Sequence, residues 1–348
     1  MKIIIALMVV MVAALLAPSP IDSQAYQPSQ PLALDGAFTA NDALQVTQLT
    51  QLPNASRGGE DVAVDALGCM YTGVENGDVL RKCPHVDWEV LANTGGRPLG
   101  LAFDAQQNLI IADGVKGLLQ LTPAQKLTVL ADSFQGKPLL VVDDVDIAAD
   151  GTMYFSDASA LFPLKDYILD GLNAQPSGRL FSYSPDTGDL KLLADQLFFA
   201  NGVAIAADQS FVLVNETFAY RTTRVWLRGE KAGQTDIFTS HLPGVPDGIA
   251  ADADGTFWMA LFAPRSALVD KIQPLPFVKN QLAKLPKSLT PIPPAYGFVI
   301  QLDKDGKVLQ SLHDQAAVAI GEITSVQPEK DGLYLGTLHG PAIGKLAF

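Results

Sequence analysis

A motif that recurs six times constrains the fold of this chain more than any other feature of its sequence. Each copy has an alternating apolar run, a turn such as AADG or DADG, and a second apolar run that ends in small residues. Alternation with a period of two residues around such a turn predicts an antiparallel hairpin. The copies are EDVAVDALGCMYTG from Glu60, LGLAFDAQQNLIIAD from Leu99, DDVDIAADGTMYFSD from Asp143, NGVAIAADQSFVLVN from Asn201, DGIAADADGTFWMAL from Asp247 and, in weaker form, TSVQPEKDGLYLGT from Thr324.

The spacing of the copies predicts how the hairpins assemble. Three of the five intervals are close to the length of about 40 to 45 residues that is typical of a four-stranded propeller blade. The two longer intervals are expected to carry insertions. We therefore expect an all-β protein, a six-bladed β-propeller over residues 46–348. A pair of β-sandwiches is the alternative, but it would not explain the repeated unit.

The first residue of each copy forms a column that points to a metal site. The innermost strand of each propeller blade runs along a central channel, so equivalent positions in different blades form a ring. Four of the six positions carry oxygen-bearing side chains, and these are Glu60, Asp143, Asn201 and Asp247. Three carboxylates this close repel one another strongly unless a cation lies among them. Because oxygen ligands without His or Cys suit a hard cation, we expect Ca²⁺.

Turn chemistry offers a simpler interpretation of each member of the column. Asp and Asn commonly cap turns at the start of a strand. Recurrence in one column favours the metal site over that alternative. Asp143 and Asp247 are then the candidate general bases. Alternation directs the neighbouring Asp144 toward the packing between blades, where we expect it to accept backbone or hydroxyl hydrogen bonds.

The N-terminus predicts export. An apolar run from Ile3 to Ala17 follows Met1 and Lys2. Its length is short for a membrane span and typical of a signal peptide, so residues 1–23 are expected to be either a signal peptide or a membrane anchor, followed by a linker over residues 24–45. We expect a periplasmic protein, or one anchored in the membrane and facing the extracytoplasmic side. The net charge of −13, without a basic cluster, argues against a nucleic-acid partner.

Two cysteines, Cys69 and Cys83, flank a hairpin pattern with Gly77 at its tip. That geometry would place them on facing strands, where an oxidising compartment favours a disulfide. Two free buried thiols are an equally weighted alternative.

Two insertions are expected at the same end of the propeller. Residues 161–178 have short helical character, and residues 262–296 combine apolar positions with four lysines. Both could close the channel mouth as lids, and the second could instead contact a membrane surface through its apolar and lysine-bearing faces. The four lysines are Lys271, Lys279, Lys284 and Lys287.

Several motifs also resemble a known family. GGEDVAVDALGCMYTG, TGGRPLGLAFD, DDVDIAADGTMYFSDAS, FANGVAIAADQSFVLVNET and LRGEKAGQTDIF are similar to segments of strictosidine-synthase-like proteins, in the branch that contains adipocyte plasma membrane-associated protein. The wider group of six-bladed calcium propellers includes gluconolactonase-type lactonases and paraoxonases. The resemblance extends over roughly residues 45–346 and implies the propeller fold more firmly than any one reaction.

The resemblance also implies site residues. The group binds catalytic calcium through one Glu, two Asn and one Asp, which Glu60, Asn201 and Asp247 match, with Asp143 in place of the other Asn. The channel His of paraoxonases is matched by Leu99, and the Arg of gluconolactonases by Val141. The sequence further departs from strictosidine synthase, which has a Glu where this chain has Ser325, and this argues against amine–aldehyde condensation.

The function expected from these observations is calcium-dependent hydrolysis of lactones or aryl esters by an exported monomer. The substrate would be a small-molecule ester or lactone. A non-catalytic propeller that binds a ligand or partner and holds calcium structurally is the second expectation. A condensing or lyase activity of the strictosidine synthase type is the third.

Overall fold

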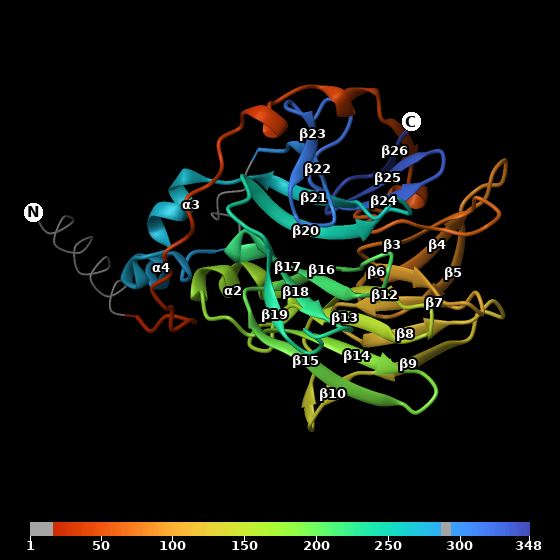
Figure 1. The fold of residues 1–348 in the computed structure, drawn as a ribbon, viewed down its shortest axis with the longest axis horizontal. Helices are drawn as coiled ribbons and strands as arrows, with labels where there is room; N and C mark the ends of the chain where they lie inside the picture. The colour runs from red at the N-terminus through yellow and green to blue at the C-terminus, as the bar shows by residue number, and fades with distance from the viewer. Residues whose placement is uncertain (1–16, 287–293) are drawn as a thin grey trace, which may run out of the picture.

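Six four-stranded antiparallel sheets form a six-bladed β-propeller in the computed structural model, which describes residues 17–286 and 294–348. The first strand of each sheet contacts the first strand of the next sheet, so the sheets are arranged as blades around a channel (Figure 1). The six-bladed fold predicted from the repeats is therefore confirmed.

Each repeated motif forms the two inner strands of a blade, and the residues that follow it form the two outer strands. The first three blades are β2 (Ala63–Val64), β3 (Met70–Gly73), β4 (Asp78–Lys82) and β5 (Glu89–Asn93); β6 (Pro98–Phe103), β7 (Leu109–Asp113), β8 (Gly117–Leu121) and β9 (Leu127–Ala131); and β12 (Val142–Ile147), β13 (Met153–Asp157), β14 (Gly178–Ser184) and β15 (Asp189–Leu197). A separate hairpin, β10 (Ser133–Phe134) with β11 (Lys137–Pro138), connects the second and third blades.

The last three blades follow the same order. They are β16 (Ala200–Ile205), β17 (Phe211–Glu216), β18 (Arg221–Trp226) and β19 (Thr235–Thr239); β20 (Gly244–Ala251), β21 (Phe257–Pro264), β22 (Gly297–Leu302) and β23 (Val308–Asp314); and β24 (Ile323–Glu329), β25 (Gly332–Thr337), β26 (Ala342–Leu346) and β1 (Gln48–Gln51).

The last blade joins the two ends of the propeller domain. Its outermost strand, β1, comes from the N-terminal side and pairs antiparallel with β26, with Gln48 opposite Lys345. The first and sixth blades are therefore joined through the backbone, and β26 is not left as an open edge.

The hydrophobic core consists of layers between successive blades. One layer contains Leu213 of β17, Met259 of β21 and Phe298 of β22, all fully buried. The inner strands β16 and β17 are buried along their whole length, because another blade packs on each of their faces. The outer strand β15 is instead largely exposed, and its sequence DLKLLADQL is accordingly more polar.

The segment over residues 24–45, expected to be a linker, runs in mostly extended conformation along the propeller. We call residues 19–46 the strap. It contains the 3-10 helices η1 (Gly36–Phe38) and η2 (Ala43–Val46). Specific contacts hold it in place, including the bond from the Gln24 N–H to the Asn173 carbonyl at 2.8 Å and that from the Arg265 Nη2 to the Ser29 carbonyl at 2.7 Å. Phe38 and Leu44 are buried against the fifth and sixth blades.

Short helices form in both predicted insertions. The first contains η4 (Leu164–Asp166) and α2 (Tyr167–Asn173), and the second contains α3 (Ala267–Ile272) and α4 (Pro276–Leu282). Two further 3-10 helices are η3 (Pro53–Ala55) and η5 (Thr217–Ala219). Helix α2 packs against α4, and α2, α3 and α4 lie at the same end of the propeller (Figure 1).

The second insertion was predicted to have a lysine-bearing face, and this prediction is wrong for Lys279. Lys279 is completely buried, and its Nζ donates to the Gln24 carbonyl at 2.6 Å and to Gln273 Oε1 at 3.2 Å. The lysine therefore fixes the strap to the lid. Lys287 and the apolar run over residues 3–16 lie outside the described residues. Within the described ranges, no helix has both the length and the apolar character needed to cross a bilayer.

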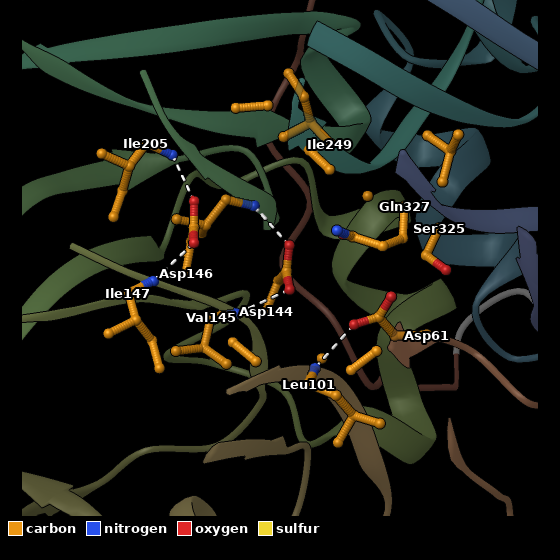
Figure 2. A pocket seen from close by; sticks show the side chains of 18 of the residues that line it. Asp61, Leu101, Asp144, Val145, Asp146, Ile147, Ile205, Ile249, Ser325 and Gln327 are labelled. Carbon is orange, nitrogen blue, oxygen red and sulfur yellow. Dashed lines mark hydrogen bonds between the residues drawn. The ribbon is translucent and has the colours of Figure 1, made fainter. Parts of the chain in front are cut away.

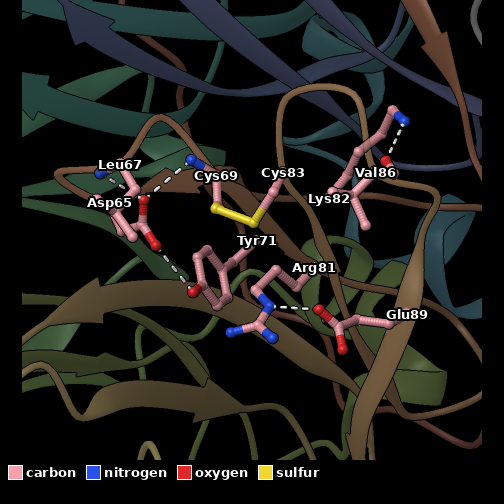
Figure 3. Close-up of a disulfide and its surroundings, with 9 residues drawn as sticks. All are labelled: Asp65, Leu67, Cys69, Tyr71, Arg81, Lys82, Cys83, Val86 and Glu89. Atoms are coloured by element: carbon pink, nitrogen blue, oxygen red, sulfur yellow. Dashed lines mark hydrogen bonds and ion pairs between the residues drawn. A yellow bond between two sulfur atoms is a disulfide. The ribbon is translucent and has the colours of Figure 1, made fainter.

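Cys69 and Cys83 form a disulfide across the first blade (Figure 3). Their neighbours Met70 and Lys82 are paired in the ladder between β3 and β4, so the cysteines face one another at its end. Close by, the Tyr71 hydroxyl donates to Asp65 Oδ2 at 3.0 Å. The structure therefore selects the disulfide over the two free thiols.

Candidate metal centre

The four predicted ligand residues come together at one end of the channel. Glu60 precedes β2, while Asp143, Asn201 and Asp247 lie on β12, β16 and β20. All four line a single cavity of about 460 Å³. The other two residues of the column, Leu99 and Thr324, line the same cavity. The ring inferred from the repeat therefore exists as a spatial arrangement.

Glycines next to the column allow the inner strands to approach closely. A Cβ atom on Gly202 would lie 2.4 Å from the Asp247 carbonyl oxygen, and one on Gly248 would lie 2.5 Å from the Thr324 carbonyl oxygen. Any larger residue would force these strands apart. The Asn-Gly and Asp-Gly pairs in the repeat thus bring Asn201 and Asp247 close together at one end of the channel.

The carboxylates of this cluster repel one another. Burial raises the pKa of Asp143 well above its ordinary value, and the charges of Glu60 and Asp247 raise it further. Burial, together with the charge of Glu60, likewise raises the pKa of Asp247, although a hydrogen bond from Asn201 opposes the shift. The pocket therefore favours positive charge, either as bound protons or as a cation.

Arg97 is a site residue that the column did not reveal. Its Nη2 donates to Glu60 Oε2 at 2.9 Å and its Nη1 donates to the Gly58 carbonyl at 2.9 Å, with the side chain almost fully buried. Burial raises the pKa of Glu60, and the Arg97 guanidinium partly offsets this rise. Asp113 fixes the loop that carries Arg97 by accepting the Arg97 N–H at 3.0 Å. The motif TGGRPLG held this signal, but nothing in the repeat relates its position to Glu60.

A second layer of polar residues lies one position deeper in the channel (Figure 2). The Asp61 carboxylate accepts the Leu101 N–H of the next blade at 2.8 Å. The Asp144 carboxylate accepts the Val203 N–H of the next blade at 2.7 Å, which confirms the expectation that Asp144 accepts backbone hydrogen bonds. These two aspartates therefore link neighbouring blades, although they also line the cavity.

Asp146 repeats this arrangement at the next inward position of β12. Its carboxylate accepts the Ile205 N–H at 2.7 Å, and burial raises its pKa to about 6 (Figure 2). The third and fourth blades are therefore joined by two aspartates in succession. Ser325, which replaces the glutamate of strictosidine synthase, donates to Asp61 and is part of the same second layer.

Asn215 fixes the backbone beneath a predicted ligand. Its Nδ2 donates to the Asp247 carbonyl at 2.6 Å, and its Oδ1 accepts the Thr222 hydroxyl at 2.7 Å. Asn215 begins an Asn-x-Thr glycosylation sequence, but its side chain is fully buried in this contact. It acts instead as a positioning residue for Asp247.

Helix α2 lies at the same end of the propeller as the carboxylate cluster. Burial raises the pKa of Tyr167, and the charges of Glu60, Glu322 and Asp247 raise it further, so the phenol lies in the field of the cluster. Tyr167 also packs on the apolar group formed by Val141, Ala158 and Phe199. His339 also lies in the field of Glu60, and its Nδ1 lies 3.1 Å from Glu322 Oε2.

The chemistry of the donor set fits a hard cation. The side chains that converge offer carboxylate and amide oxygens, and the buried carboxylates carry more negative charge than Arg97 alone can compensate. In the described ranges, however, no group of three or more His, Cys, Asp or Glu side chains has the arrangement of a metal site. The Arg97 guanidinium already contacts one oxygen of the Glu60 carboxylate.

Two family models match the chain. The strictosidine synthase model matches residues 143–230, and the model of the strictosidine synthase-like N-terminal region matches residues 36–82. The adipocyte plasma membrane-associated protein of Rattus norvegicus is 30% identical over 96% of this chain and 95% of its own length. The Arabidopsis thaliana protein strictosidine synthase-like 6 is 34% identical over 80% of this chain and 76% of its own length.

Solved structures share the fold at lower identity. A gluconolactonase from Xanthomonas campestris superimposes with a TM-score of 0.62 at 19% identity, covering 94% of this chain and 98% of that one. The calcium-binding protein regucalcin from Agrobacterium tumefaciens gives a TM-score of 0.57 at 15% identity, covering 84% and 93%. The repeats, the closed ring of six blades and the similarity over nearly the full length all support one conclusion. The chain belongs to the strictosidine synthase-like family that includes adipocyte plasma membrane-associated protein.

Proposed function

We propose that this protein is an exported, calcium-dependent hydrolase of lactones or aryl esters. The observation that supports this most directly is the convergence of Glu60, Asp143, Asn201 and Asp247 on a single cavity of about 460 Å³. Similarity to propellers described as a gluconolactonase and as a calcium-binding protein supports the same class of chemistry. The N-terminal apolar run and the disulfide support export.

Glu60, Asp143, Asn201 and Asp247 would hold the cation. When bound, calcium supplies a positive charge that polarises the carbonyl of an ester and stabilises the charge that develops on its oxygen. Asp143 and Asp247 are placed to accept a proton from the attacking water at a carboxylate oxygen. Asn201 orients the Asp247 side chain, and Asn215 holds the Asp247 backbone. Tyr167 and the apolar group beneath it limit the access of bulk water.

Arg97 has a distinct role in this proposal. It holds Glu60 in one orientation through a bond of 2.9 Å and supplies a permanent positive charge that also acts on Asp143. The Gly58 carbonyl, a second acceptor at 2.9 Å, keeps the guanidinium from turning away. Arg97 therefore limits the repulsion among the carboxylates before any ligand enters.

Turnover of phenyl acetate and of a γ-lactone, with and without a chelator, tests the proposed reaction. We expect turnover with Ca²⁺, loss of turnover after chelation, and an unchanged circular dichroism spectrum. Asp143→Asn should lower both calcium affinity and turnover, whereas Asp189→Asn, on the exposed outer strand β15, should change neither. Bound calcium without turnover of any ester would contradict the hydrolase.

A non-catalytic binding propeller is the second candidate. The observation that favours it is the Arg97–Glu60 ion pair, together with a cavity lining that contains no histidine among the described residues. In that case calcium would link the blades structurally. Calcium binding that raises the melting temperature without any ester turnover would favour this candidate over the hydrolase.

A further inference from the structure

Helices α3 and α4 carry an exposed apolar surface. Phe277 is 67% exposed and Leu268 is 64% exposed, and three further exposed large apolar side chains lie in α3, in the link to α4 and just after α4. The five residues, which we call the α3–α4 surface, are Leu268, Val269, Leu275, Phe277 and Leu285. Exposed apolar residues gathered in one short segment are uncommon in proteins surrounded only by water and mark interaction surfaces.

Two polar side chains of this segment are buried, whereas several of its large apolar side chains are exposed. Gln273 and Lys279 face inward, where Gln273 Nε2 donates to the Gly171 carbonyl of α2 at 3.1 Å and Lys279 donates to the strap. Lys279 is completely buried, while Phe277, two residues earlier, is largely exposed. An amphipathic helix on a water-soluble protein has the opposite arrangement. The outward face is therefore suited to an apolar environment.

The segment that follows the N-terminal apolar run contacts helix α4. The Ser23 N–H donates to Asn280 Oδ1 at 3.2 Å, and the Ser23 hydroxyl donates to the Pro276 carbonyl at 3.0 Å. The run from Ile3 to Ala17 ends only six residues before Ser23, and six extended residues span at most about 20 Å. A bilayer that contains the run would therefore come within reach of α4.

We propose that the α3–α4 surface inserts into the interface of a lipid bilayer, next to the N-terminal apolar run. The exposed residues supply apolar contact. Attraction to anionic lipids is not the expected driving force, because the chain carries a net charge of −13 and Lys279 is turned inward. Zwitterionic phosphatidylcholine is therefore the partner lipid. This inference does not depend on the proposed hydrolase activity.

The proposal has a structural consequence for the channel. Helix α2 packs against α4, and Tyr167 of α2 lies in the field of Glu60 and Asp247. A bilayer in contact with α3 and α4 would therefore lie at the same end of the propeller as Glu60 and Asp247.

Quenching by brominated lipid tests the contact in the full-length chain. Phe277→Trp and Leu268→Trp place a fluorophore on the α3–α4 surface. Leu67→Trp is the matched control, because Leu67 is 81% exposed in the turn between β2 and β3, at the opposite end of the first blade from Glu60. Each variant is reconstituted into phosphatidylcholine vesicles with or without bromine in the acyl chains, and the floated fraction is measured.

We expect bromine to reduce the added emission at positions 277 and 268 by at least half and to leave that at position 67 unchanged. The wild-type protein supplies the background from its own tryptophans. Absence of quenching at both 277 and 268, equal quenching at all three positions, or failure of the full-length chain to float would each overturn the proposal. A second copy covering the surface would appear as emission at 277 that is already blue-shifted without lipid and unchanged by bromine, and this result would also overturn it.

Discussion

Replacing Asp170 by asparagine would remove a buried charge from helix α2. Asp170 is only 4% exposed, and its Oδ2 has no hydrogen-bond partner in the described part of the chain. Burial raises the pKa of Asp170 to about 6 from an ordinary value of 3.8, while a hydrogen bond from Ser159 opposes the shift. The folded state therefore resists ionisation of this side chain. Asparagine has nearly the same shape and stays neutral at every pH.

The sign and size of the effect follow from proton linkage. The pKa of Asp170 is higher in the folded state than in the unfolded state. Asp170 therefore does not lower the free energy of unfolding below about pH 3.8, and it lowers this free energy increasingly as pH rises through about 6. A difference of roughly two pKa units at 1.36 kcal/mol each gives a loss of about 3 kcal/mol above pH 7. The free energy of unfolding of the variant, relative to wild type, should rise by that amount between pH 4 and pH 7.

Urea unfolding followed by tryptophan fluorescence, at half-unit steps from pH 4 to pH 8, measures the difference. Only its change with pH is diagnostic, since the amide could alter local hydrogen bonds by an amount that is the same at each pH. A difference between wild type and Asp170→Asn that stays constant across this range would refute the reasoning.

Three other predictions test separate parts of the molecule. Burial lowers the pKa of Lys279 to about 8, so wild-type stability should rise with pH between about 8 and 10.5, and thermal melting of Lys279→Met should lack that rise. The double variant Cys69→Ser/Cys83→Ser should lose about 3 kcal/mol in urea unfolding, as expected for a loop of this size, and dithiothreitol should then have no further effect. Asn215→Ala should weaken calcium binding about 10- to 100-fold in calorimetry, because the Asp247 backbone loses its support. Unchanged affinity would show that Asn215 does not position the site.

The repeat predicted the fold well because hairpins are encoded locally. In NGVAIAADQSFVLVN, alternation and a turn specify two paired strands, and the structure pairs Val203 with Val214. The sequence also predicted that Glu60, Asp143, Asn201 and Asp247 lie close together. Each of them is the first residue of a repeat copy, and the first residues of all copies lie at the same end of the central channel. Arg97 lies outside that periodic pattern, so only the structure shows its guanidinium beside Glu60.

The sequence by itself determined the number of blades, the strand pattern and the set of oxygen-bearing side chains, because each depends on residues close together in the chain. Tertiary structure alone decided that Asp144 bonds a neighbouring blade, that Lys279 turns inward to hold the strap, and that α3 and α4 expose apolar residues. These features arise from contacts between residues such as Gln24 and Lys279, far apart in sequence. Their burial, and the pKa shifts that burial causes, exist only once the ring has closed.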